Sequence, residues 1–340
     1  MQRSAGLMAM FLPGHEFQET QNKIEAFRLF AFVDQELNFP KDRLESLPAM
    51  ARRASALGNY KSIWAMEGVS NFYTAAVSPV HDRLSGLLAD PEIPETAMVP
   101  MHAGMGTAYA GHLLNQLPVA PSSAALADTV RRFSDFCAAN ARPGWYDNAV
   151  EPLGLAVRSL HPHLLSQVSD AVAALDPHVH QLFWHGVGRS LYFVPTNFAT
   201  FGSAHARVVQ SAIQEAPGLE ARRNIIAGLV WAIALVNIRH SAVLKNLLRA
   251  TRDIETPEAL INGITSALMV WKHMVPGDAA FLPQYLRLSD DQLWNDRVAA
   301  PALKVFADVY PGLLCQHRVA TLFSYRGLHA GFAKPDGIIK

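Results

Sequence analysis

The stretch "FWHGVGRSLYF", residues 183–193, decides how the whole chain is interpreted. Most of its positions are apolar, as in a buried helix, yet it carries Gly186 and Gly188 together with His185 and Arg189. A glycine in a helix interior costs about 1 kcal/mol relative to alanine. Two glycines here therefore predict either close contact with another helix or space cleared for a ligand that the histidine and the arginine hold.

The same pattern recurs along the chain. Six segments carry a glycine next to an apolar run, at successive spacings of about 36, 50, 32, 42 and 35 residues. The six glycines are Gly68, Gly104, Gly154, Gly186, Gly228 and Gly263. In four segments a small residue follows one helical turn later, which leaves a flat strip for a neighbouring helix backbone. We predict an all-α fold, a degenerate helical-repeat array of helix pairs of about 35–40 residues with Gly-rich inner helices.

The composition of the chain and the positions of its prolines both favour a helical fold. Half of the 340 residues are apolar and 17% are charged, which is typical of a globular chain with a substantial core. Alternating strand patterns are scarce, and prolines separate many short helical segments. We expect a single all-α domain over residues 1–340, with an N-terminal helical arm (1–54), a Gly-helix repeat core (55–285) and a C-terminal helical cap (286–340).

Charge and cysteine content limit the binding partners and the cellular compartment that we expect for this protein. Lys plus Arg and Asp plus Glu number 29 each, so no basic surface for nucleic acid is predicted. The most apolar run, "IIAGLVWAIALVNI", is shorter than a membrane span and predicts a core helix. The two cysteines have no zinc or redox spacing, and the N-terminus lacks a clear cleavage site, so we expect a cytoplasmic protein. The segment "GVGRS" lacks the ending of a phosphate loop, and we expect no cofactor.

Polar residues beside the glycines are the candidate catalytic groups. If the glycine helices line one interior, Glu67, His102 and Arg189 project toward it. Arg189 would then bind a carboxylate or carbonyl oxygen, while Glu67 or His102 moves a proton. The alternative is purely structural: Arg189 forms a buried bridge with Glu67 or Glu151 that fixes the packing of the helices.

Further residues near the glycines are predicted to bind a ligand. They are Glu151, His185, Trp184, Tyr192 and Asn262. The tryptophans next to the glycine segments either fill the core or wall an apolar pocket. These tryptophans are Trp64, Trp184, Trp231 and Trp271.

Four histidines raise the question of a metal site. His161 and His163, and likewise His178 and His180, are two residues apart, and His-x-His in an extended segment suits a metal. Prolines beside both pairs instead indicate helix starts, where histidines commonly face solvent. No acidic ligand accompanies them at a metal-binding spacing, so we expect no metal site.

The order of the glycine segments resembles a bacterial domain family of uncharacterised function found in enediyne biosynthetic gene clusters. The motifs that carry the resemblance are Glu67-Gly68, His102-Ala103-Gly104-Met105-Gly106, the helix around Gly154, Gly186-Val187-Gly188-Arg189-Ser190-Leu191-Tyr192-Phe193, and the helices around Gly228 and Gly263. The middle helix departs from the family, because Ala156 and Arg158 stand where the family carries an acidic and an aromatic residue. The resemblance implies a setting in natural-product assembly and no established reaction.

Three functions follow from these observations. The first is an accessory protein that binds a hydrophobic, polyketide-like intermediate in a cavity between the inner helices. The second is a cofactor-independent cyclase, isomerase or lyase that acts on such an intermediate through Glu67, His102 and Arg189. The third is a helical-repeat scaffold for other biosynthetic enzymes. A sealed apolar pocket with converging polar groups is expected for the first two, and a solvent-facing apolar groove for the third.

Overall fold

The fold is predominantly helical in the part of the chain that the computed structural model describes, which is residues 14–40, 43–77, 84–199, 204–251 and 254–278 and positions 292, 295–296, 300 and 304. No strand occurs among these residues, so the prediction of an all-α chain is confirmed. The predicted C-terminal cap falls almost wholly outside the described residues. The repeat-array detail of the fold stays a prediction.

The chain divides into two compact units. The split unit takes both end sections of the chain, Met1–Ile24 and Val187–Lys340, and the continuous unit is Glu25–Gly186. Two helices, α2 (Gly14–Ala31) and α11 (Pro177–Phe193), contain residues of both units. The predicted division into arm, core and cap has other boundaries and stays a prediction.

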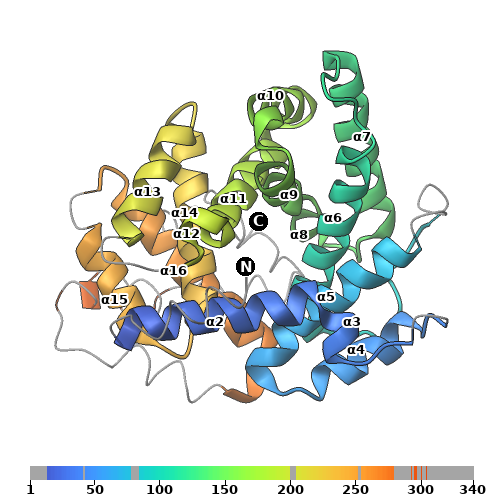
Figure 1. Cartoon of the computed structure of the whole chain (residues 1–340), viewed down its shortest axis with the longest axis horizontal. Helices are drawn as coiled ribbons and strands as arrows, with labels where there is room; N and C mark the ends of the chain where they lie inside the picture. The colour runs from blue at the N-terminus through green and yellow to red at the C-terminus, as the bar shows by residue number, and fades with distance from the viewer. Residues whose placement is uncertain are drawn as a thin grey trace. The chain divides into compact units, whose positions relative to one another are not determined.

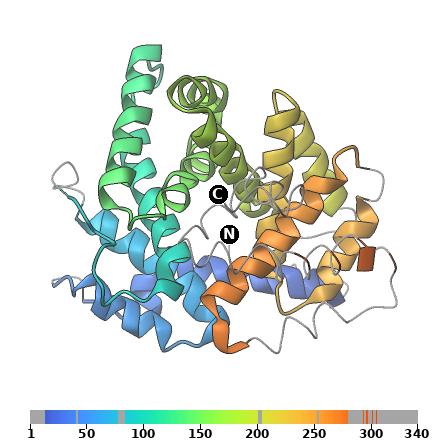
Figure 2. The same cartoon turned by 180° about the vertical axis from the view of Figure 1, so that it is seen from behind.

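The continuous unit is built from short and medium helices (Figure 1). They are α3 (Val33–Glu36), α4 (Leu47–Ser55), α5 (Asn59–Ala76), α6 (Met98–Leu114), α7 (Ser123–Asn140), α8 (Tyr146–Val150), α9 (Pro152–Leu160) and α10 (Leu165–Leu175), with 3-10 turns η2 (Glu95–Ala97) and η3 (Pro162–Leu164). Helices α5 and α6 lie side by side in both views (Figures 1 and 2).

The split unit holds five further helices and one 3-10 turn in its described part. They are α12 (Pro195–Phe198), α13 (Ala204–Glu215), α14 (Leu219–Val236), α15 (Ser241–Ala250), α16 (Pro257–Met274) and η4 (Pro276–Asp278). Helices α14 and α16 pack along each other (Figure 2).

Prolines mark helix starts, as the sequence predicts. Pro152, Pro177, Pro195 and Pro257 each stand at the first position of their helix. Proline is tolerated there because the amide it lacks has no partner inside the helix. The start of α7 uses a different device, since the Ser122 hydroxyl accepts a hydrogen bond from the Ala125 amide at 3.2 Å.

In the continuous unit, glycines allow backbone-to-backbone contact. A Cβ atom on Gly104 would overlap the carbonyl oxygen of Glu67 and lie 2.9 Å from the Asn71 amide nitrogen. A Cβ on Gly186 would overlap the carbonyl oxygen of Glu151 in the same way. These separations lie well inside ordinary van der Waals contact. No side chain fits at either position, and the prediction of close helix contact is confirmed for both glycines.

The split unit has the same kind of contact on both sides of α14. A Cβ on Gly188 would overlap the Ile225 carbonyl oxygen and lie 2.7 Å from the Leu229 amide nitrogen. A Cβ on Gly263 would overlap the Ala227 carbonyl oxygen. Helix α14 is therefore in close backbone contact with α11 at Gly188 and with α16 at Gly263.

Helix α14 contains the apolar run that the sequence assigns to the core. Every residue from Asn224 to Val236 is buried in it, and the core-helix prediction is confirmed. None of the described helices combines the length and the apolar character that crossing a bilayer demands.

The glycine contacts predict opposite effects for two substitutions in one helix. Gly104→Ala should lower the free energy of unfolding by about 2–3 kcal/mol, because its methyl group forces two backbones apart. Gly111→Ala should raise it by about 0.5–1 kcal/mol, since a Cβ there meets only the Leu160 Cδ1 atom at 3.8 Å and alanine favours the helix. Denaturant unfolding of both variants measures the difference. Equal stability of the two would contradict close packing at Gly104.

Candidate functional site

Two predicted ligand-binding residues form a buried pair in the continuous unit. The Glu151 Oε1 atom lies 2.8 Å from the His185 Nδ1 atom, and both side chains are at most 2% exposed. Glu151 stands at the start of α9, and His185 precedes Gly186 on α11. Because Gly186 brings α11 against the backbone of Glu151, the same contact brings the two side chains together.

Trp184, the neighbour of that pair, is a buried helix residue. Its indole Nε1 donates to the His180 Nε2 atom at 3.0 Å, one turn earlier on α11. The side chain is 2% exposed. The structure therefore places Trp184 in the core of the continuous unit.

His102 is held in its neutral form. Its Nδ1 lies 2.7 Å from the Met98 carbonyl oxygen, and its Nε2 accepts a hydrogen bond from the Arg142 amide at 3.0 Å. Burial lowers the pKa of His102 to about 3, although the hydrogen bond to Met98 opposes this shift. The ring also stacks on Trp145, with centroids 5.9 Å apart. The Nε2 contact thus holds the segment before α8, whereas the Nδ1 contact lies within α6. A proton-transfer role for His102 stays a prediction.

The remaining predicted residues are divided between the units. Glu67 is buried on α5 of the continuous unit, and Asn262 is buried on α16 of the split unit. Arg189 lies in the split unit, with its Cζ atom 5.0 Å from the centre of the Trp231 ring. The predicted meeting of Glu67, His102 and Arg189 joins residues of both units and stays a prediction.

The paired histidines face separate partners. His178 and His180 lie on α11, which begins at Pro177 as the proline indicates, and not in the extended segment that a His-x-His metal pair would need. His178 Nε2 is 2.9 Å from the Asp147 Oδ2 atom, and His180 Nε2 is 2.9 Å from the Ser169 hydroxyl. Within the described part of the chain, no group of three or more His, Cys, Asp or Glu residues is placed to hold a metal ion.

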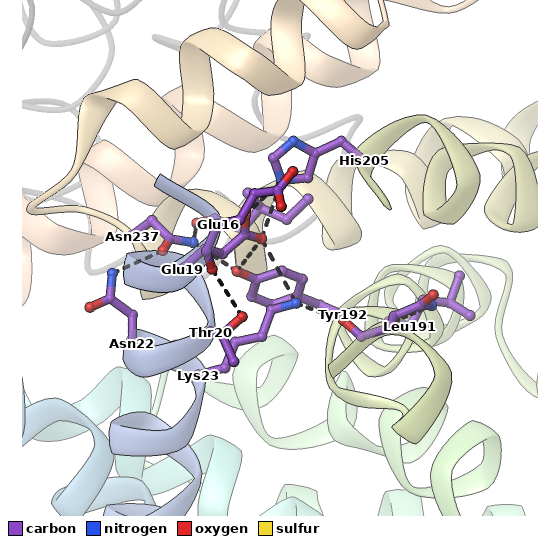
Figure 3. Close-up of polar contacts among 11 residues, drawn as sticks. Glu16, Glu19, Thr20, Asn22, Lys23, Leu191, Tyr192, His205 and Asn237 are labelled. Atoms are coloured by element: carbon purple, nitrogen blue, oxygen red, sulfur yellow. Dashed lines mark hydrogen bonds and ion pairs between the residues drawn. The ribbon is translucent and has the colours of Figure 1, made fainter. Parts of the chain in front are cut away.

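A buried polar cluster surrounds Glu19, which the sequence did not indicate (Figure 3). Glu19 lies on α2 with no solvent exposure. Its Oε1 accepts a hydrogen bond from the Tyr192 hydroxyl at 2.9 Å, and its Oε2 is 3.0 Å from the His205 Nε2 atom. Helices α2, α11 and α13 thus converge on one carboxylate within the split unit.

Lys23 supplies the matching positive charge. Its Nζ lies 3.8 Å from the Glu19 Oε1 atom, donates to the Asn197 carbonyl oxygen at 2.8 Å and sits 3.8 Å from the centre of the Tyr192 ring. Burial lowers the pKa of Lys23 to about 8 against the opposing effect of Glu19. Burial alone would raise the pKa of Glu19, but charge interactions with His205 and Lys23 and the hydrogen bonds lower it to about 2.

Two asparagines extend this Glu19 cluster to α14. Asn237 donates from Nδ2 to the Tyr192 hydroxyl at 2.7 Å and to the Ile233 carbonyl oxygen at 2.8 Å. Asn22 donates from Nδ2 to the Asn237 Oδ1 atom at 2.9 Å. The predicted ligand residue Tyr192 therefore lies in a fully buried network that holds the first half of α2 (Figure 3).

A cleft of about 500 Å³ adjoins the helix that carries His205. Aliphatic and polar side chains line it from α13, the first turn of α14, and the end of α15 with the segment after it. The lining residues are Ala206, Val209, Gln210, Ile213, Arg222, Arg249, Ala250, Thr251, Ile254 and Glu255. His205 directly precedes the first of these residues, so α13 takes part in both the Glu19 cluster and the cleft.

Two guanidinium groups give the cleft its chemical character. Arg222 Nη1 lies 3.0 Å from the Glu255 Oε2 atom, and Arg249 Nη1 is 3.3 Å from the Asn246 Oδ1 atom. The Nε atom of Arg222 is buried and has no hydrogen-bond partner among the described residues. As placed, this atom is out of reach of solvent, and an unsatisfied buried donor is unfavourable, so a small rotation that brings it to a partner in the cleft is favoured. The cleft can therefore accept an anion next to aliphatic surface.

Comparisons with protein-family models, with curated proteins and with solved structures found no match to this chain.

The pKa of Glu19 predicts that the free energy of unfolding decreases over a defined range of acidic pH. Its folded value of about 2 lies below the ordinary 4.5, so its contribution is complete above about pH 4.5 and is lost as the pH falls toward 2. Glu19→Gln should lower the free energy of unfolding at pH 7 by on the order of 3 kcal/mol and flatten its pH dependence between those values. Denaturant unfolding at a series of pH values measures this.

Glu92→Gln serves as the control, because Glu92 pairs with Arg52 at the surface, where both side chains are more than 60% exposed. If Glu19→Gln had the same free energy of unfolding and the same dependence on acid pH as this control, the partners of Glu19 would not stabilise its buried carboxylate.

Proposed function

We propose that this chain binds a small molecule that combines an apolar body with an acidic group, and that the cleft beside α13 holds it. The observation that carries the proposal is the lining itself, in which Arg222 and Arg249 face the same space as Val209, Ile213 and Ile254. Ligand sites are concave and about 300–1,000 Å³ in volume, with a few polar groups that fix orientation. Arginine is the side chain best suited to a carboxylate.

This proposal retains the natural-product setting that the sequence resemblance implies. A hydrophobic, polyketide-like intermediate that carries a carboxylate has the chemistry the cleft would recognise. The place differs from the expected interior of the glycine helices, where the backbones are in contact at Gly104, Gly186, Gly188 and Gly263. An accessory binding role in the cytoplasm, without a cofactor, remains part of the proposal.

A cofactor-independent enzyme is the second candidate, and the Glu19 cluster favours it. Glu19 and Lys23, whose pKa values are both lowered, lie in contact with each other and with the Tyr192 hydroxyl and ring, and His205 contacts Glu19, as acidic and basic groups do in acid–base sites. Turnover would require this cluster to open to a substrate, because Glu19 has no solvent exposure. Binding in the open cleft needs no such step, and it is the primary proposal. No feature in the described ranges favours the scaffold role over these two.

Calorimetric titration with decanoate and with decanol tests the proposal. Both probes have the same apolar chain, and only decanoate carries the acidic group. We expect decanoate to bind at one site at least tenfold more tightly than decanol, and Arg249→Gln to remove most of that preference. Arg207→Gln is the control, since Arg207 is an exposed residue of α13 that does not line the cleft.

Equal affinity for the acid and the alcohol would contradict the proposal, as would an unchanged preference in Arg249→Gln. Chemical conversion of an offered polyketide acid, lost in Tyr192→Phe, would instead favour the enzyme.

A further inference from the structure

Glu255 occupies one of the two guanidinium groups of the cleft. Its Oε2 atom is 3.0 Å from Arg222 Nη1, and no second bond between these two side chains accompanies this contact. The Glu255 side chain is 78% exposed, and that of Arg222 is 29% exposed. An exposed pair of this kind contributes little to stability, because solvent screens it and a long side chain must be ordered. The carboxylate of Glu255 can therefore leave at small cost.

Arg222 has hydrogen-bonding capacity that Glu255 does not use. Guanidinium groups bind carboxylates best through two parallel N–H···O bonds, and the Nε donor of Arg222 has no partner among the described residues. A planar carboxylate that approached from the cleft, with a small rotation of the arginine, would engage this donor. It would make more bonds to Arg222 than Glu255 makes.

We infer that Glu255 is an internal competitor, whose carboxylate holds Arg222 in the empty cleft and gives way to the carboxylate of the ligand. The inference rests on the proposed function and specifies it. The ligand's acidic group is a carboxylate, and Arg222 binds it together with Arg249. Glu255 lowers the affinity of the cleft for every anion, so only an acid that binds Arg222 more strongly than Glu255 does displaces it.

The chain provides a matched control at the adjacent positions. Arg223 Nε lies 3.2 Å from the Glu258 Oε1 atom, with side chains 37% and 31% exposed. This pair joins the same helix, α14, to the start of α16, but neither residue lines the cleft. Removal of Glu258 therefore changes the net charge and breaks an ion pair without freeing a cleft arginine.

Titration of decanoate and decanol into the wild type, Glu255→Gln and Glu258→Gln tests the inference. Glu255→Gln should bind decanoate about three- to tenfold more tightly, because the competing pair and its repulsion of the ligand are both removed. Its affinity for decanol should stay the same. Glu258→Gln should match the wild type with both probes, and Arg222→Gln should bind decanoate no better than decanol. The melting temperature of each ligand-free variant verifies folding.

The outcomes separate this inference from the proposal beneath it. If the wild type prefers decanoate and Glu255→Gln binds it equally or more weakly, the competitor role is wrong while the binding site stands. The competitor role is also wrong if Glu258→Gln gains as much affinity as Glu255→Gln. If neither the wild type nor Glu255→Gln prefers the acid, both ideas fail together. Acid binding that appears only in Glu255→Gln supports the competitor.

Discussion

Contact between helix backbones at glycine is the constraint on which the rest of the structure depends. At Gly186 and Gly188 the neighbouring carbonyl oxygen stands where a side chain would begin, so the position and rotation of α11 are fixed from its backbone outward. The placement of α11 then determines which side chains come into contact. Gly186 places His185 against Glu151, and Gly188 sets α11 against α14, where Tyr192 reaches Asn237. Both candidate polar sites thus inherit their geometry from positions that have no side chain.

Fold class and helix contacts could be predicted because their signals are local. A glycine within an apolar run and a proline at its border are visible in a window of one or two helical turns, and the structure confirms what they indicate at Gly104, Gly188 and Pro152. The partner of each buried polar group is not local. His185 was predicted to bind a ligand together with Arg189, four residues later, but its acidic partner, Glu151, is 34 residues earlier.

The Glu19 cluster and the cleft were missed for the same physical reason. Glu19 and Lys23 are four residues apart, a spacing typical of an exposed helix pair, and their burial follows from partners 173 and 174 residues away. Arg222 and Arg223 form a doublet that resembles a solvated helix face. Only the tertiary structure shows that the first lines a cleft and the second does not. Charge patterns therefore carried less information here than the glycines, because burial decides what a charge does.

The split unit takes its N-terminal part, the first half of α2, from one end of the chain and its other helices from beyond residue 186. Glu19 and His205 are 186 residues apart. During synthesis on the ribosome the continuous unit is complete before His205 has been made, whereas the first half of α2 must wait for its partners. Glu19 and Lys23 can reach their buried positions only after the residues that contact them, Tyr192, Asn197 and His205, have been made. A truncation that removed the first half of α2 would take away the carboxylate that Tyr192 and His205 contact.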